Sequence, residues 1–137
     1  MKSFCSKADL FSLNVPEEWT IHTEYPYKFT KEGFIEGILQ ISAFHSKNIE
    51  FNVSNELPKV LSKHPSAYIA KISDYDSIQY TENHIPEVVL MHSWIIGQGN
   101  IKIFCTFTVN ANQQQQKLDA HLLEVFDILQ TLKLACP

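Results

Sequence analysis

The sequence contains no arginine, because all eleven of its basic residues are lysine. Arginine supplies the planar, bidentate cation that clamps a transferring phosphoryl group, so its absence excludes arginine-dependent phosphoryl chemistry. The formal net charge is -4 at pH 7. Recognition of nucleic acid needs clustered positive charge, so nucleic acid is not an expected partner.

Cysteine is also scarce, and its three copies are far apart. Cys5, Cys105 and Cys136 are odd in number and form no C-x-x-C pair, so the sequence predicts neither a disulfide framework nor a zinc site. No apolar run approaches the ~18 residues of a membrane-spanning helix, and the first ten residues hold no apolar stretch of signal-peptide length. We therefore expect a protein of the reducing cytoplasm, without a membrane span.

The rest of the composition is typical of a globular domain. The chain has 137 residues, of which 45% are hydrophobic and only four are glycine. This length suits one domain with one core, and this hydrophobic content can offset the entropy lost on folding. We expect a single domain over residues 1–137 that is a monomer or a homodimer.

Alternating apolar residues predict most of the strands. Phe11, Leu13 and Val15 follow one another at period two, and Pro16 then starts a turn. A later strand-like segment has apolar residues on both faces, which is typical of a central strand. The predicted strands cover residues 8–15, 19–23, 34–45, 67–73 and 75–81.

Two apolar runs between residues 87 and 110 are joined by the sequence GQGN, whose glycines suit a tight hairpin turn. With Gln98 and Gly99 as the central pair of the turn, His92 lies opposite Cys105. This register aligns apolar residues of both strands on one face. The other face is partly apolar as well, so we expect elements packed against both sides of the hairpin.

Two segments carry helical spacing. Leu57, Val60 and Leu61 fall at i, i+3 and i+4 and predict a short helix over residues 55–61. A leucine-rich stripe after a capping-box spacing predicts a helix over residues 113–133, which spans ~30 Å and can cross a sheet. Together these elements predict an α+β fold: an antiparallel sheet of about six to seven strands flanked by helices on both faces, as an α/β/α sandwich.

Three features carry a resemblance to a known family: the opening FSLNVPEEW at residues 11–19, the strand GILQISAF at residues 37–44, and the final hairpin followed by a helix. In these features the chain resembles the PsbP-like fold family. That family includes the photosystem II extrinsic subunit P, the Ran-binding import factor of fungi, bacterial DcrB-like proteins and the Eag chaperones of type VI secretion effectors. The resemblance implies that Pro16 turns the first hairpin and that Trp19 packs in the core. It also implies a non-catalytic protein that docks onto another protein.

His92 and Cys105 are a candidate base and nucleophile, since an imidazole beside a thiol can generate the thiolate. The alternative is that both face a core, where cysteine behaves as a small hydrophobe. We favour the structural role, because neither a third orienting group nor a glycine motif for an oxyanion hole accompanies them.

Metal sites are not indicated. The six histidines show no H-x-H or H-x-x-x-H spacing. Asp74, Asp76 and Glu82 could gather around calcium, but the segment lacks the alternating ligands and the turn glycine of a defined calcium site. We expect no metal and no cofactor.

The best candidate for an interaction surface is an aromatic cluster on an edge strand or loop: Tyr25, Tyr27, Phe29 and Phe34. Exposed aromatic residues are favoured as interface anchors, although burial under a neighbouring loop would explain them equally well. We therefore expect a non-catalytic binding or accessory module, such as an adaptor, chaperone or immunity-type factor. It would recognise another protein through the sheet edge and residues 25–34. The alternative is an enzyme or small-ligand protein with a pocket around His92 and Cys105.

Overall fold

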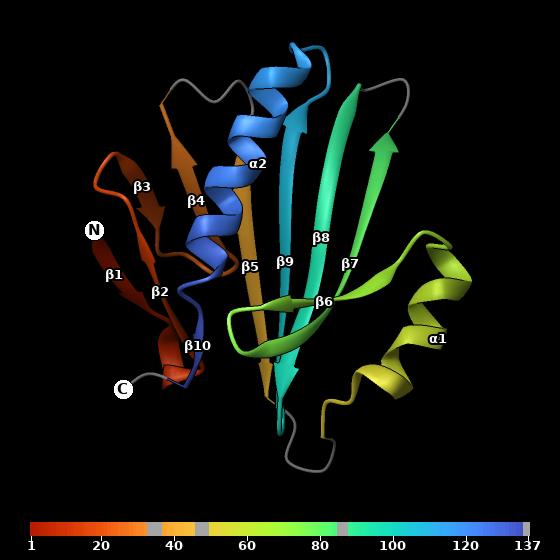
Figure 1. The fold of residues 1–137 in the computed structure, drawn as a ribbon. Helices are drawn as coiled ribbons and strands as arrows, with labels where there is room; N and C mark the ends of the chain where they lie inside the picture. The colour runs from red at the N-terminus through yellow and green to blue at the C-terminus, as the bar shows by residue number, and fades with distance from the viewer. Residues whose placement is uncertain (33–36, 46–49, 85–87, 136–137) are drawn as a thin grey trace.

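The chain is an α+β protein with a seven-stranded antiparallel sheet, a smaller three-stranded sheet and two helices (Figure 1). The computed structural model describes residues 1–32, 37–45, 50–84 and 88–135, and the counts refer to these. The elements are β1 (Lys2–Cys5), a 3-10 turn (Lys7–Asp9), β2 (Phe11–Val15), β3 (Trp19–His22), β4 (Tyr27–Lys31), β5 (Ile38–His45), α1 (Val53–Lys63), β6 (Tyr68–Ile72), β7 (Tyr75–His84), β8 (Val89–Gln98), β9 (Ile101–Asn110), α2 (Gln115–Leu129) and β10 (Lys133–Leu134).

The large sheet has the strand order β3-β4-β5-β9-β8-β7-β6. Its central hairpin, β8–β9, pairs two residues away from the predicted register: Gln98 lies opposite Ile101, so that Gly99 opens the turn. Gly99 has φ 59°, which suits the first central position of a type II′ turn, whereas the predicted turn would have put Gln98 there. A shift of two residues keeps every side chain on its predicted face.

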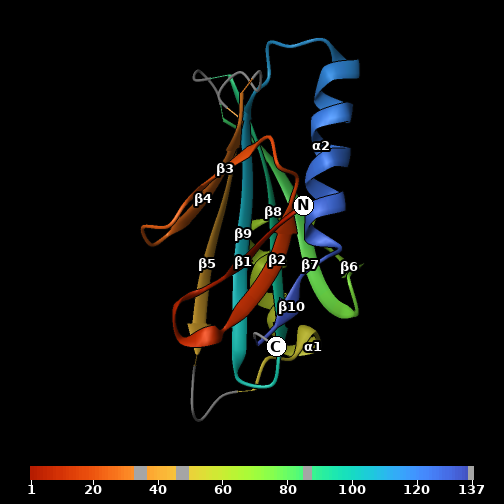
Figure 2. The same cartoon turned by 90° about the vertical axis from the view of Figure 1, so that its left-hand side faces the viewer.

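The small sheet, in the order β1-β2-β10, was not predicted as a separate unit. Its strands lie side by side next to the β3–β4 hairpin (Figure 2). β2 and β3 are therefore neighbours in sequence but belong to different sheets. Phe4, Phe11 and Leu13 point into the core and close its end.

The largest core cluster lies between the sheet and α2. From α2 it contains Val125, Ile128 and Leu129, all at most 1% exposed. The helix is shorter than predicted and ends at Leu129, because the chain then turns and pairs with β2 as β10. Trp19 is 1% exposed in this cluster, as the resemblance implied.

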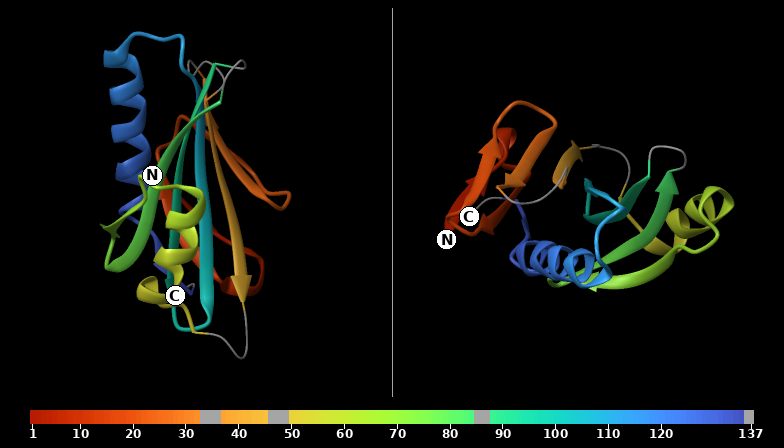
Figure 3. Two further views of the ribbon diagram at one scale, coloured as in Figure 1. Left: turned by 90° about the vertical axis from the view of Figure 1, so that its right-hand side faces the viewer. Right: turned by 90° about the horizontal axis from the view of Figure 1, so that it is seen from above.

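The helix α1 contributes to a second cluster, in which Val60 packs with Ile78, Tyr80 and Ile95. It begins after Asn52, whose side chain accepts a hydrogen bond from the Ser54 N–H at 2.8 Å. Seen from above, α1 lies at the β6–β7 end of the molecule and α2 lies along the sheet (Figure 3). No helix among the described residues is both long and apolar enough to cross a membrane.

The cysteines differ from the prediction. Cys5 is disulfide-bonded, Cys105 is a free and buried thiol, and Cys136 lies outside the described residues. The bond was missed because cysteine spacing does not show which parts of the chain meet in space. Disulfides persist mainly in oxidising compartments, so this bond does not support the expectation of a reducing one.

Candidate functional site

The predicted aromatic cluster is divided by the fold. Tyr27 and Phe29 alternate onto the inner face of β4 and are 3% and 0% exposed. Their rings contact Phe4 with centroids 5.0 and 5.4 Å away. Both therefore belong to the core, which was the alternative explanation, and cannot be surface anchors. Phe34 lies outside the described residues.

Tyr25 is the described member of that cluster that remains accessible, with 51% of its surface exposed. It is held in place: its hydroxyl lies 3.2 Å from both the backbone N and the backbone O of Ala43. Its ring also meets Tyr27 edge to face at 5.5 Å. A hollow of about 210 Å³ adjoins Tyr25 and is lined also by His22, Glu24, Pro26 and Lys28.

Phe44 follows Ala43 in β5 and is 52% exposed. It shares a face of β5 with Ile38, Gln40 and Ser42, and we call these four residues the outer face of β5. The alternate residues of β5, Leu39 and Ile41, are fully buried. The β3–β4 turn that carries Tyr25 projects away from α2 (Figure 2). Tyr25 and Phe44 are thus two half-exposed aromatic side chains at the same end of the sheet, since Tyr25 bonds to the residue before Phe44, and we call this end the Tyr25–Phe44 surface.

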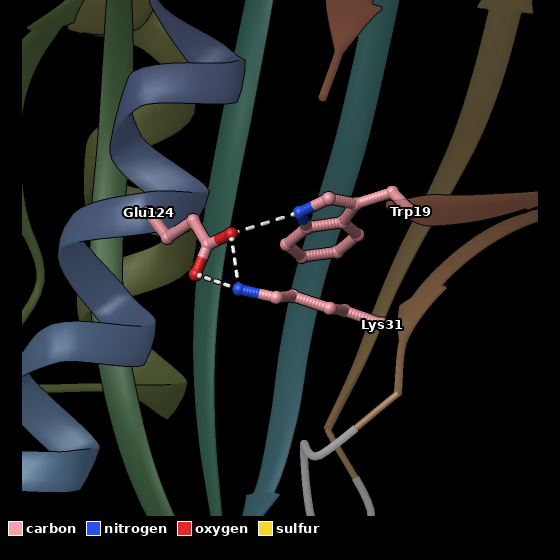
Figure 4. A network of polar contacts seen from close by, with 3 residues as sticks. All are labelled: Trp19, Lys31 and Glu124. Carbon is pink, nitrogen blue, oxygen red and sulfur yellow. Dashed lines mark hydrogen bonds and ion pairs between the residues drawn. The ribbon is translucent and has the colours of Figure 1, made fainter. Parts of the chain in front are cut away.

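A polar network fixes the β3–β4 hairpin to α2 (Figure 4). The Glu124 carboxylate accepts a hydrogen bond from the indole N–H of Trp19 at 3.0 Å. Lys31 Nζ lies 2.9 and 3.1 Å from the two carboxylate oxygens. The Lys31 and Glu124 side chains are about a quarter exposed, so the pair is partly shielded from solvent. Sequence reasoning missed this network, because nothing local connects residues that are 105 positions apart.

The proposed base and nucleophile are not directly opposed. His92 lies across from Phe107, with ring centroids 6.4 Å apart, and Cys105 lies across from Trp94. Complete burial raises the pKa of the Cys105 thiol far above its ordinary value. Burial also lowers the pKa of His92, whose Nδ1 is 3.1 Å from Thr81 Oγ1. A thiol held in its protonated form this way is a poor nucleophile.

The acidic residues considered for calcium do not converge. Asp76 forms an ion pair with Lys71 at 3.0 Å, and Glu82 lies 3.6 Å from His64. Within the described ranges, no three histidine, cysteine or acidic side chains are placed so that they could hold a metal ion.

A family model described as "Domain of unknown function (DUF3805)" matches residues 1–133. The chain belongs to this family. A comparison of the DUF3805 chain with curated proteins found no match.

Solved structures of other proteins share the fold of this DUF3805 chain. A protein from Bacteroides thetaiotaomicron is 25% identical with a TM-score of 0.75, over 98% of this chain and 48% of that one. The chain therefore spans about half the length of that relative. LpqN of Mycobacterium tuberculosis, which is involved in cell envelope biogenesis, is 9% identical with a TM-score of 0.61, over 92% of this chain and 83% of that one. Cyanobacterial PsbP (CyanoP) from Synechocystis is 8% identical with a TM-score of 0.62, over 97% of this chain and 91% of that one. At such identities the likeness shows the fold alone, and it confirms a PsbP-like fold.

Proposed function

We propose that this DUF3805 domain is a non-catalytic module that binds another protein through the Tyr25–Phe44 surface. The observation that carries the proposal is that two large aromatic side chains, each about half exposed, lie at the same end of the sheet, where the Tyr25 hydroxyl bonds to the residue before Phe44. Aromatic residues supply large, rigid contact areas and are enriched among the residues that dominate binding energy. The adjoining polar residues of β5 would form the rim of such an interface.

The rigidity of the surface supports the same function. Tyr25 is anchored on the backbone of β5, and the hairpin that carries it is fixed to α2 by Glu124. A preorganised surface loses less conformational entropy when it binds. The aromatic rings would therefore meet a partner without first being ordered.

The architecture that leaves this surface open is part of the proposal. Ile95 and Ile96 are consecutive residues of β8, yet Ile95 packs in the cluster of α1 and Ile96 in the cluster of α2. Because successive side chains of a strand point to opposite faces, we infer that the two helices cover opposite faces of the large sheet. The helix α1 would then share the outer side of the sheet with the outer face of β5.

The test is capture of a tagged protein from a lysate of its source organism, followed by native mass spectrometry. The Phe44→Ser variant should capture at least about tenfold less partner than the wild type, because truncating an aromatic residue that dominates an interface costs about 2 kcal/mol or more. Leu123→Ser is the matched control, since Leu123 is an equally apolar side chain that is 64% exposed on α2.

The control should retain the partner at a defined stoichiometry, and both variants should melt within about 2 °C of the wild type. A partner that is captured equally by Phe44→Ser would contradict the assigned surface. Recovery of the bare domain from all three preparations would contradict the binding function itself.

A further inference from the structure

The small sheet carries a hollow on the face that points away from the core. Phe4, Phe11 and Leu13 face the core, and the alternate residues of β1 and β2 therefore point outward. The hollow has a volume of about 450 Å³, which lies in the range of small-molecule sites. We call it the Ser12 hollow, and its three strands lie in the foreground of Figure 2. Besides Phe4 and Cys5, it is lined by Ser3, Asp9, Ser12, Asn14, Thr131 and Lys133.

The two charged residues of the hollow lie on opposite sides of it. Cys5 of β1 and Lys133 of β10 are both directly opposite Ser12 of the central strand β2, so these three residues form one row. Neighbouring strands are about 4.8 Å apart, which places Cys5 and Lys133 about 10 Å from each other along the row. Asp9 lies next to Cys5, with its Oδ1 atom 3.3 Å from the Cys5 sulfur. A carboxylate and an ammonium group therefore flank Ser12.

Neither charged group is neutralised by another side chain. Asp9 and Lys133 form no ion pair within the part of the chain that the structure describes. The Cys5 sulfur belongs to a disulfide, so it has no hydrogen to donate to the Asp9 carboxylate. Asp9 and Lys133 are both exposed. Each can therefore take a group of opposite charge from a bound molecule in a charge-assisted hydrogen bond.

The backbone that carries Asp9 is strained. Ala8 and Asp9 both adopt left-handed conformations, with φ 63° and 55°. This conformation is unfavourable for alanine, because its Cβ atom crowds the following carbonyl oxygen. The turn is held by the buried Ser6, whose hydroxyl accepts hydrogen bonds from the N–H groups of Leu10 and Phe11 at 3.0 and 3.1 Å. Strained backbone that its surroundings hold in place occurs often at ligand sites, which favours a binding role for this turn.

Polar groups that suit a peptide bond lie between the two charges. The Asn14 carboxamide accepts a hydrogen bond from the Ser3 hydroxyl at 2.9 Å through Oδ1, so its NH₂ group is the end that can donate to a ligand. Ser12 lies two residues away on the same face, and its hydroxyl can donate or accept. A peptide bond presents a carbonyl acceptor and an N–H donor, which these two side chains can match.

We propose that the Ser12 hollow binds a free dipeptide with small side chains. The ammonium group of the dipeptide pairs with Asp9, its carboxylate pairs with Lys133, and its peptide bond lies over Ser12 and Asn14. An extended dipeptide spans about 7 Å, and a charge-assisted hydrogen bond of about 2.8 Å at each end extends its reach to about 12 Å. Phe4, the aromatic residue of the lining, is buried, so the lining offers no exposed ring to hold a large apolar side chain.

The probe for the test is glycylglycine at pH 7, where both of its ends are charged. Two analogues each lack one charge: N-acetylglycylglycine lacks the ammonium group, and glycylglycinamide lacks the carboxylate. Glycine keeps both charges but has no peptide bond. Nuclear magnetic resonance of ¹⁵N-labelled protein follows the backbone amide signals of Ser12 and Asn14. The amide signal of Gln40 in β5, in the other sheet, is the internal control.

Glycylglycine should shift the Ser12 and Asn14 signals with a dissociation constant on the order of 1 mM, which is reasonable for a ligand of this size. The Gln40 signal should stay in place. Each of the three analogues should bind at least about tenfold more weakly, because each loses a charge-assisted hydrogen bond or the contacts of the peptide bond. No saturable shift of the two signals, or equal binding of any analogue, would overturn the proposal.

Two variants remove one charge each from exposed positions and keep the size of the side chain. Lys133→Gln and Asp9→Asn should each weaken glycylglycine binding at least about tenfold, and asparagine also tolerates the left-handed conformation of residue 9. Lys28→Gln, at an exposed lysine of β4, is the matched control and should leave binding unchanged. All three variants should melt within about 2 °C of the wild type, because they alter exposed side chains.

A folded Lys133→Gln or Asp9→Asn variant that binds glycylglycine as well as the wild type would overturn the proposal. The Ser12 hollow shares no residue with the Tyr25–Phe44 surface, so it is independent of the proposed protein partner. The Phe44→Ser variant should accordingly bind glycylglycine like the wild type.

Discussion

Gly97 is the position at which a single methyl group should do most damage to the packing of α1 on the sheet. A Cβ atom there would lie 2.4 and 2.7 Å from two ring carbons of Phe51 and 2.8 Å from the carbonyl oxygen of Ile101. The ring can swing aside, but the carbonyl belongs to the backbone of β9. Phe51 also fixes the chain just before α1, because its N–H donates to the Gly99 carbonyl.

Overpacking of this kind typically costs about 1–3 kcal/mol. Part of this cost is offset, because alanine has less conformational entropy than glycine in the unfolded chain. We therefore expect Gly97→Ala to lower the free energy of unfolding by about 2 kcal/mol. With an unfolding entropy of about 2.1 cal/mol/K per residue, this corresponds to a fall in Tm of about 7 °C. Urea unfolding followed by tryptophan fluorescence and a thermal scan would measure both.

Two comparisons separate steric crowding from backbone strain. At Gly99 a Cβ atom meets nothing within 4 Å, but φ is +59°, so Gly99→Ala should cost about 1 kcal/mol from backbone strain alone. In a Phe51→Ala background, Gly97→Ala should cost clearly less than in the wild type, because two of its three close contacts are gone. An equal cost in both backgrounds would refute the packing argument.

Three further predictions concern single side chains. Glu124→Ala should lower the free energy of unfolding by about 1–3 kcal/mol in urea, because it removes the acceptor of Trp19 and Lys31; a change below about 0.5 kcal/mol would mean that the network is not stabilising. Burial lowers the pKa of His92 from its ordinary 6.5, so the unfolded chain binds this proton first as the pH falls. The contribution of neutral His92 to the free energy of unfolding is complete above pH 6.5 and is lost as the pH falls through the lower folded-state pKa. The His92→Gln variant should therefore show a smaller difference in stability between about pH 7.5 and 5.5 than the wild type. An unaltered difference would contradict this. Cys105 should resist iodoacetamide in the folded protein and react in urea, since burial raises its pKa; rapid alkylation of the folded protein would instead favour a reactive pocket around it.

The sequence alone determined which face most side chains take. The alternation at Phe11, Leu13 and Val15 predicted a strand with these three residues on one face, and in the structure all three are at most 1% exposed. In the β8–β9 hairpin the predicted faces are right although the register is two residues off. A period of two in a strand is a local property, and a local pattern can be read without knowing the partner strand.

The tertiary structure decided which segments meet. It placed β2 in a sheet with β1 and β10, and it buried Tyr27 and Phe29 under that sheet while leaving Tyr25 exposed. It also brought Glu124 to Trp19 across 105 residues of chain. Such contacts depend on how whole elements pack, and the gain in burying apolar surface is not directional. The same aromatic residue can therefore be a core residue or a surface anchor, and only the folded chain shows which of the two it is.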